Sequence, residues 1–243
     1  MARLLARPQA GARLLSLRST PSVGAAQDAV FQVDGVVPGN RESYDEEQIR
    51  LMEEQCILVD EEDLPLGPAS KKELHLMSST GGPPPLHRAF SVFLFDSQNR
   101  LLIQKRAHDK ILFPAYWANT CCSHPWHTDE EMELEDAMGV KRAAVRKLDH
   151  ELGISADQVP IEDFKYLTAV HYAAGSDDPK WGEHEVDHIL FIKPTGDVDI
   201  TLRYESWFES WFESHSYSFI IHALLMKCTC GGGSERWLWE GLT

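Results

Sequence analysis

Runs of apolar residues indicate where the strands of this chain lie. Residues 88–95 are apolar on both alternating faces, which predicts a central strand covered on both sides. A polar turn at 97–99 leads into the apolar residues 101–103, which we expect to pair with the central strand as a hairpin. Further strands are expected over 56–59, 164–172 and 183–193.

Helical spacing replaces this pattern between residues 139 and 153. One apolar stripe is formed by Val140, Ala144, Leu148 and Leu152, and Gly153 is expected to cap the C-terminal end. Strands on either side of a long helix, joined by hairpins, predict an α/β (α+β) fold in which a mixed β-sheet packs between α-helices.

Two shorter features precede the central strand. Ser43, with Glu46 three residues later, forms a capping box, which predicts a short helix running to about Gln55. Pro65 and Gly67 predict a turn after the strand at 56–59.

Charged side chains lie on both faces of the predicted strand 183–193. A period of two places Glu183, Glu185 and Asp187 on one face, and His184, Val186 and His188 on the other. Two carboxylates two residues apart on a strand are close enough to share one cation.

Length and composition favour one catalytic domain with tails. The 243 residues, 43% of them hydrophobic, can bury one full core, and we expect a catalytic domain at 41–200 between terminal segments 1–40 and 201–243. The formal charge of -15 argues against binding nucleic acid through a basic surface. Five cysteines without a regular spacing indicate free thiols in a reducing compartment.

The first 27 residues differ from the rest of the chain. They contain four arginines interleaved with leucines and no acidic residue, a composition typical of mitochondrial transit peptides. An ordinary disordered tail is the alternative, with a cytoplasmic or peroxisomal location. No apolar stretch approaches the length of a membrane span.

The stretch 119–125 brings a thiol close to an imidazole, because Cys122 lies two residues before His124. A thiol can exchange a proton near neutral pH, and a neutral histidine nitrogen can bind a metal. A buried thiol beside an unrelated imidazole is the alternative for this pair taken alone.

Four spaced motifs, at 71–75, 86–91, 119–125 and 181–187, resemble those of type I isopentenyl-diphosphate isomerases. The resemblance runs from about Tyr44 to Ile200 and implies a Nudix-type fold. Residues 146–154 resemble a degraded Nudix box, in which Lys147 and His150 stand where hydrolytic members usually carry glutamates.

The resemblance implies two metal sites. One divalent ion would be held by His75, His87, His124, Glu183 and Glu185, and nitrogen ligands suit Zn2+ or Mn2+. Glu151 resembles the ligand of a second ion, Mg2+, that would also contact the substrate diphosphate. Each histidine taken singly is better explained as a surface or core imidazole, and the other eight histidines keep that interpretation.

The resemblance also implies the substrate and the catalytic groups. The diphosphate contacts would be Lys71, Arg106, Lys110 and the backbone of Ser123, although solvated surface charge is the alternative for the lysines. Cys122 and Glu185 would handle protons on opposite faces of the alkene, with Tyr172 near the developing cation. The implied activity interconverts isopentenyl and dimethylallyl diphosphate in isoprenoid, including sterol, biosynthesis. We expect a monomer.

The C-terminal segment departs from the family pattern. It lacks the usual Thr-Pro-Trp-Phe run whose tryptophan covers the site, and carries instead Trp207 and Trp211, which would share one face if the segment were helical. An inactive, non-enzymatic binding protein is therefore one alternative. A Nudix pyrophosphohydrolase is another, although of the glutamates it needs on the helix Glu151 alone remains.

Overall fold

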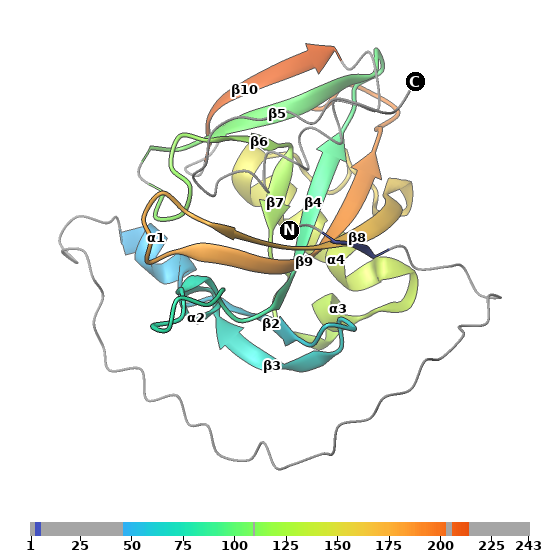
Figure 1. Ribbon diagram of the computed structural model, residues 1–243. Coiled ribbons are helices and arrows are strands. Elements are labelled where there is room, and N and C mark those ends of the chain that lie inside the picture. The colour runs from blue at the N-terminus through green and yellow to red at the C-terminus, as the bar shows by residue number, and fades with distance from the viewer. Residues whose placement is uncertain (1–2, 6–45, 109, 203–205, 214–243) are drawn as a thin grey trace, which may run out of the picture.

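The computed structural model describes residues 3–5, 46–108, 110–202 and 206–213 (Figure 1). The strands are β1 (Arg3–Leu5), β2 (Gln55–Val59), β3 (Pro65–Ser70), β4 (His87–Leu94), β5 (Arg100–Arg106), β6 (Trp117–Asn119), β7 (Cys121–Ser123), β8 (Lys165–Gly175), β9 (Gly182–Ile192) and β10 (Ser206–Glu213). The α-helices are α1 (Glu46–Leu51), α2 (Lys71–His75), α3 (Asp129–Met132) and α4 (Met138–Leu152). Short 3-10 helices lie at Glu135–Ala137 and Ile161–Asp163.

The strands form two sheets. A seven-stranded sheet has the order β1-β8-β9-β4-β2-β3, with β7 also paired to β4, and a three-stranded sheet has the order β10-β5-β6. β4 runs parallel to β9, whereas the other described pairs are antiparallel. The large sheet is therefore mixed, as the sequence predicted.

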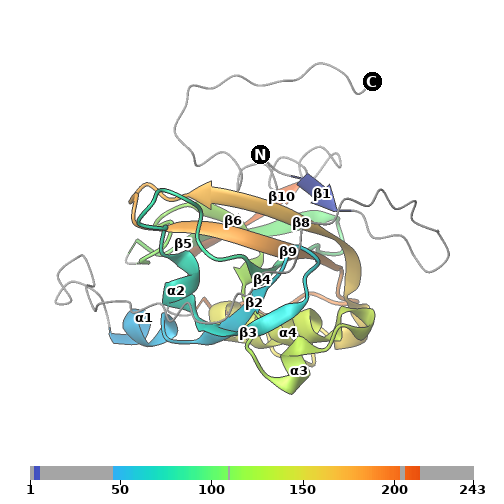
Figure 2. The same ribbon diagram turned by 60° about the horizontal axis from the view of Figure 1, so that its bottom comes forward.

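β4 is the central strand, and both of its faces are covered as predicted. On one face Phe90, Val92 and Leu94 are fully buried against the apolar stripe of α4. On the other face Phe93 packs with Leu101 and with residues of β8 and β9. Figure 2 shows α4 beneath the sheet strands. The helix thus covers one face of β4, whereas side chains of β5, β8 and β9 cover the other.

The long helix also matches the prediction. α4 ends at Leu152, and Gly153 adopts a left-handed conformation with a φ of 65°. Its backbone N–H donates to the Asp149 carbonyl at 2.9 Å. Glycine enters this conformation without the steric cost that a side chain would impose.

Three local predictions need correction. Residues 101–103 do not form a hairpin along β4, because Phe95 and Leu101 make a single isolated bridge, after which β5 turns into the small sheet. α1 ends at Leu51, and Gln55 is already part of β2. Pro65 and Gly67 lie in β3 instead of a turn.

The turn that precedes β3 is built by aspartates. The Asp60 carboxylate accepts hydrogen bonds from the backbone N–H groups of Glu62 and Leu64 at 3.1 and 2.8 Å, and Asp63 has a positive φ of 64°. Aspartate side chains that bond to the following backbone form turns of this kind. The turn signal therefore lay a few residues before Pro65.

The terminal segments are described in part. Arg3–Leu5 forms β1, a strand that the sequence did not predict, and it pairs with β8. Residues 206–213 form a strand beside β5, so the helical arrangement considered for Trp207 and Trp211 is wrong. The predicted cap at Ser43 and most of the segment resembling a transit peptide lie outside the described residues. Among the helices described, none is long and apolar enough to cross a membrane.

Candidate active site

Three imidazoles meet where α2, β4 and the end of β7 come together. His75 is the last residue of α2, His87 the first of β4, and His124 follows β7. Each pair of rings has its centroids 4.9 Å apart. Glu185 joins them because parallel pairing places it opposite His87. One ligand atom from each of these four buried side chains lies within 4.8 Å of all the others.

Backbone carbonyls orient two of these rings. The Nδ1 atoms of His75 and His87 lie 2.6 and 2.9 Å from the carbonyl oxygens of Lys71 and Pro85. Because a carbonyl can only accept, each Nδ1 carries the hydrogen, and each Nε2 keeps its lone pair. Both Nε2 atoms are buried without a hydrogen-bond partner in the described structure. Metal-binding histidines are oriented in the same way.

The charge state of the imidazoles fits this arrangement. Burial, followed by the neighbouring His87 and His124, lowers the pKa of His75 well below its usual value. Burial also lowers the pKa of His124 to about 3, even though its hydrogen bond to Glu185 acts in the opposite direction. Neutral nitrogens and a carboxylate oxygen are what a divalent metal ion requires as ligands. The group therefore fits a divalent ion.

The structure joins four of the five predicted ligands in this group. Glu183 is outside it, although it lies on the same face of β9 as Glu185, as the period of two predicted. The Tyr172 hydroxyl lies 2.9 Å from the Glu183 Oε2 and 2.5 Å from the Glu185 Oε2. A phenol has one hydrogen to donate, so the two carboxylates compete for it.

Tyr172 is held directly across from Glu185 by the antiparallel pairing of β8 and β9. Burial, and then the charges of Glu183, Glu185 and Asp187, raise the pKa of Tyr172 well above its usual value. The phenol therefore stays neutral at working pH and remains a hydrogen-bond donor to the carboxylates.

The adjacent cysteines face opposite sides of the sheet. Cys121 is fully buried in the cluster that packs on α4. Cys122 is half-buried and pairs with Ser91, whose hydroxyl lies 3.7 Å from its sulfur. Ser91 donates to the Asp187 Oδ2 at 2.7 Å. Because Asp187 shares a face with Glu185, Cys122 lies on the same side of the sheet as the imidazole group.

Asn119 orients the Cys122 thiol, a contact that was not predicted. The Asn119 amide nitrogen lies 2.8 Å from the Val92 carbonyl and 3.1 Å from the Cys121 carbonyl. Since both carbonyls are acceptors, the nitrogen is fixed there and Oδ1 faces the sulfur, which lies 2.6 Å away as the donor. Ser91 was likewise not predicted. Asp187 was placed on the correct face, but without a role.

The predicted diphosphate contacts lie in separate segments. Lys71 begins α2, and its charge acts on both His75 and His124. Arg106 ends β5 and donates to the Leu112 and Phe113 carbonyls, so it holds the loop 107–116 that contains Lys110. Ser123 is buried at the end of β7. The structure leaves the diphosphate role of these four residues a prediction.

Glu151 has protein partners of its own. Its carboxylate lies 3.2 Å from the Lys147 ammonium and accepts a 2.8 Å hydrogen bond from Gln104. Lys147 also lies 3.1 Å from His150 Nδ1, and both Lys147 and Glu151 are buried. The helix thus places a cation beside the glutamate that was predicted to bind the second ion.

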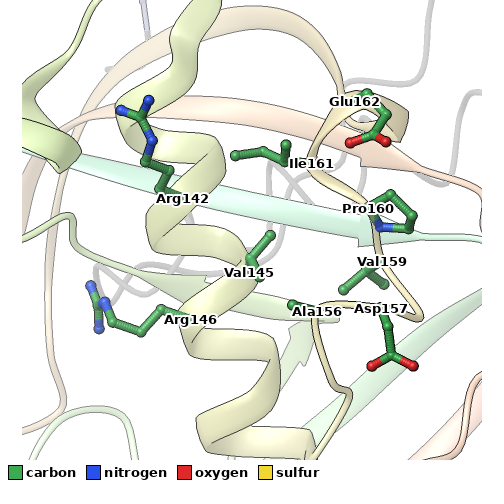
Figure 3. A pocket seen from close by; sticks show the side chains of 9 residues that line it. All are labelled: Arg142, Val145, Arg146, Ala156, Asp157, Val159, Pro160, Ile161 and Glu162. Carbon is green, nitrogen blue, oxygen red and sulfur yellow. The ribbon is translucent and has the colours of Figure 1, made fainter.

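A pocket beside α4 is lined by residues other than those of the imidazole group. It is lined by Arg142, Val145 and Arg146 of the helix and by the segment 156–162, with 159 to 161 closing one side (Figure 3). None of the predicted site residues lines it. It is therefore separate from the imidazole group.

Comparison with known proteins gives a consistent family. The Nudix domain family matches residues 85–223, which is 139 of 243 residues. The match extends past Ile200, the end of the resemblance found in the sequence motifs. An isopentenyl-diphosphate delta-isomerase of Gibberella zeae is 61% identical over 160 residues, covering 65% of this chain and 62% of that protein. The chain thus spans about three fifths of that relative's length.

Two further relatives carry the same name. The Schizosaccharomyces pombe protein is 55% identical over 66% of this chain and 70% of its own length. The Bos taurus protein is 52% identical over 63% of this chain and 66% of its own. Among solved structures, DR0079 from Deinococcus radiodurans has a TM-score of 0.44 at 18% identity over 65% of this chain and 83% of its own. The chain belongs to the isopentenyl-diphosphate delta-isomerase family within the Nudix domain family.

Proposed function

We propose that this chain interconverts isopentenyl diphosphate and dimethylallyl diphosphate. The observation that carries the proposal is the shared face of the sheet, where the Cys122 thiol, the Tyr172 and Glu185 pair and the imidazole group lie together. The names of the relatives support it. Moving a carbon-carbon double bond by one position needs one group that adds a proton and another that removes one.

The two proton-handling groups are Cys122 and Glu185. The Cys122 S–H, oriented by Asn119, gives its proton to the terminal alkene carbon, which leaves positive charge on the tertiary carbon. Glu185 then takes a proton from the neighbouring carbon, and the electron pair of that C–H bond forms the new double bond. Tyr172 donates to Glu185 and holds its carboxylate in place.

A divalent ion held by His75, His87, His124 and Glu185 would supply positive charge that fixes the ionised state of the carboxylate. Three nitrogen ligands favour Zn2+ or Mn2+ at this group. Glu183 is proposed as the fifth ligand, because the Tyr172 hydroxyl contacts both Glu183 and Glu185. Glu151 is proposed to bind a separate Mg2+ together with the substrate diphosphate, in competition with Lys147.

The cationic side chains Lys71, Arg106 and Lys110, with the Ser123 backbone, are proposed to bind the diphosphate. Several negative oxygens need several cations, and an arginine can engage two of them at once. We further propose a monomer with a mitochondrial address in residues 1–40, a catalytic domain over 41–200 and a distinct segment at 201–243.

Lys147 argues against the hydrolase alternative. A Nudix pyrophosphohydrolase needs helix carboxylates that hold metal ions, yet at this position a buried ammonium contacts Glu151 at 3.2 Å. The non-enzymatic alternative has no support from the named relatives, which are called isomerases.

The test is to incubate the purified chain with isopentenyl diphosphate and a divalent ion. We expect dimethylallyl diphosphate to form until the two isomers reach equilibrium, with no phosphate released. Release of phosphate without isomerisation would favour the hydrolase. Tight substrate binding with neither product would favour the binding protein.

A further inference from the structure

Two histidines outside the imidazole group meet on the reverse face of the β8 and β9 ribbon. His184 pairs with Ala173, and His171 pairs with Val186, so the two are diagonal neighbours on one face. Tyr172 and Glu185 are the residues next to them along the strands, and they point to the other face. The histidine pair therefore lies behind the candidate active site, with the ribbon between them.

The two rings approach each other through the same nitrogen. The Nε2 atoms of His171 and His184 are 3.0 Å apart, with the ring planes inclined by 24° and the centroids 5.1 Å apart. Both side chains are half-buried. An ion in solvent can therefore reach the space between them.

The Pro84 carbonyl fixes the tautomer of His184. The His184 Nδ1 atom lies 2.9 Å from that oxygen, so Nδ1 carries the hydrogen and Nε2 presents its lone pair to His171. His75 and His87 are oriented by backbone carbonyls in the same way. With no ion bound, the His171 Nε2–H fills the space as a hydrogen-bond donor.

The separation of the two nitrogens matches adjacent ligands of one metal ion. Imidazole nitrogens bind Zn2+ at about 2.0–2.1 Å, and two ligands at that distance are roughly 3.0 Å apart when the angle between them is near 90°. Tetragonal ions such as Cu2+ and Ni2+ prefer that angle. The second torsion of a histidine side chain is soft, so a small rotation would direct both lone pairs at a common point.

We propose that His171 and His184 form a further metal site, separate from the imidazole group and from Glu151, which is selective for Cu2+ or Ni2+ over Mg2+ and whose coordination water completes. When an ion binds there, the hydrogen of His171 moves from Nε2 to Nδ1 through solvent, so that both Nε2 lone pairs face the ion. This proposal does not depend on the isomerase activity.

The test measures Cu2+ binding by calorimetry and metal analysis. The parent is the full chain carrying His87→Gln and His124→Gln, two substitutions that disable the imidazole group. It is compared with three variants that each add one further substitution: His171→Gln, His184→Gln or the matched control His127→Gln. We expect one bound Cu2+ in the parent and in the control, and affinity weaker by roughly tenfold or more in either variant of the pair.

A second measurement uses the otherwise unaltered chain, so that the result does not depend on the stability of the multiple variants. Cu2+ is paramagnetic, and one equivalent added to a chain preloaded with Zn2+ should broaden the His171 and His184 ring resonances before those of His127. Equal binding by all variants, or simultaneous broadening of every histidine, would overturn the proposal.

Discussion

Neighbouring residues in this chain have opposite environments because they lie on strands. Cys121 packs in the core while Cys122 faces the candidate site. Glu183 and Glu185 reach Tyr172, whereas His184, between them, meets His171. At the residue scale, the chemistry of the site therefore depends on the alternation of side chains along β7, β8 and β9.

Tyr172 gives one prediction at this scale. Tyr172→Phe removes the hydroxyl that donates to Glu185 but keeps the ring that packs with Phe93 and Ile189. A hydrogen bond to a charged group contributes about 1.5–3 kcal/mol to stability, so the unfolding temperature should fall by several degrees, and kcat should fall roughly tenfold or more because the Glu185 carboxylate is no longer held in place. Steady-state kinetics and thermal unfolding check both. An unchanged kcat would show that the tyrosine serves packing alone.

A buried ion pair gives a second prediction. Asp63 accepts from Arg88 at 2.8 Å and lies 2.9 Å from His188 Nε2. Burial by itself would raise the pKa of Asp63, but the hydrogen bond and charge of His188, together with Arg88, outweigh burial and lower it. A lowered pKa stabilises the fold above the unfolded pKa of about 3.9, and that stability is lost as pH falls through the folded pKa.

Asp63→Asn should therefore lower the free energy of unfolding by about 3–5 kcal/mol near pH 7, because Arg88 is left buried without a counter-charge. The difference between variant and parent should shrink as pH falls below about 4, where the unfolded aspartate is protonated, and vanish below the lowered folded-state pKa, where the folded parent is protonated as well. Urea unfolding over this range is the measurement. A difference that stays constant with pH would contradict the assignment.

At the scale of elements, the contact between α3 and α4 positions part of the site. Glu131 of α3 binds Arg146 of α4 at 2.7 and 2.8 Å and accepts from the Trp126 backbone at 2.6 Å. Arg146 in turn donates to the His124 carbonyl at 3.3 Å. The helices thus hold the loop that carries one of the imidazoles.

Gly139 allows this close approach. A Cβ added there would lie 2.2 Å from the Glu131 carbonyl oxygen and 2.8 Å from that of Glu133. Gly139→Ala should therefore destabilise the fold by about 1–3 kcal/mol or more and reduce turnover, because α3 must shift. Gly196→Ala is the matched control, since a Cβ there meets no atom within 4 Å. Equal unfolding temperatures for the two variants would rule out the explanation.

Elements with a strong internal pattern were predictable. β4, β9 and α4 follow from continuous or periodic apolar residues, which dictate burial on both sides of a strand or on one stripe of a helix. β5 was recognised as a strand, but the strands that it pairs with were not predicted. Its pairing depends on which hydrophobic cluster each of its leucine side chains packs into. Leu101 and Leu102 belong to different clusters, a choice that local sequence does not encode.

At the scale of the whole molecule, the candidate metal group joins α2, β4, β9 and the loop after β7, which are distant in sequence. Family resemblance predicted these ligands, but spacing alone could not show that Glu185 enters the group while Glu183 contacts Tyr172. Nor could it show the partners of Glu151, because Lys147 and Gln104 reach that carboxylate from a helix turn and from another strand.

Such a group makes a bound ion a cross-link as well as a cofactor, which gives a prediction for metal removal. An ion present at 100 times its dissociation constant adds about 2.7 kcal/mol, so chelation should lower the unfolding temperature by roughly 5–10 °C and abolish turnover. His87→Ala combined with His124→Ala should reduce the metal content in the same way. Full turnover after chelation would exclude the proposed site.

The most direct measurement compares Cys121→Ala and Cys122→Ala in one assay of isopentenyl diphosphate conversion. Cys122 faces Ser91 and the site, so losing its proton should lower turnover at least about a hundredfold, as expected for a general acid. Cys121 lies in the core, and its loss should cost some stability but leave turnover within a few-fold of the parent. Equal losses in the two variants, or full activity in Cys122→Ala, would contradict the assignment of the proton donor.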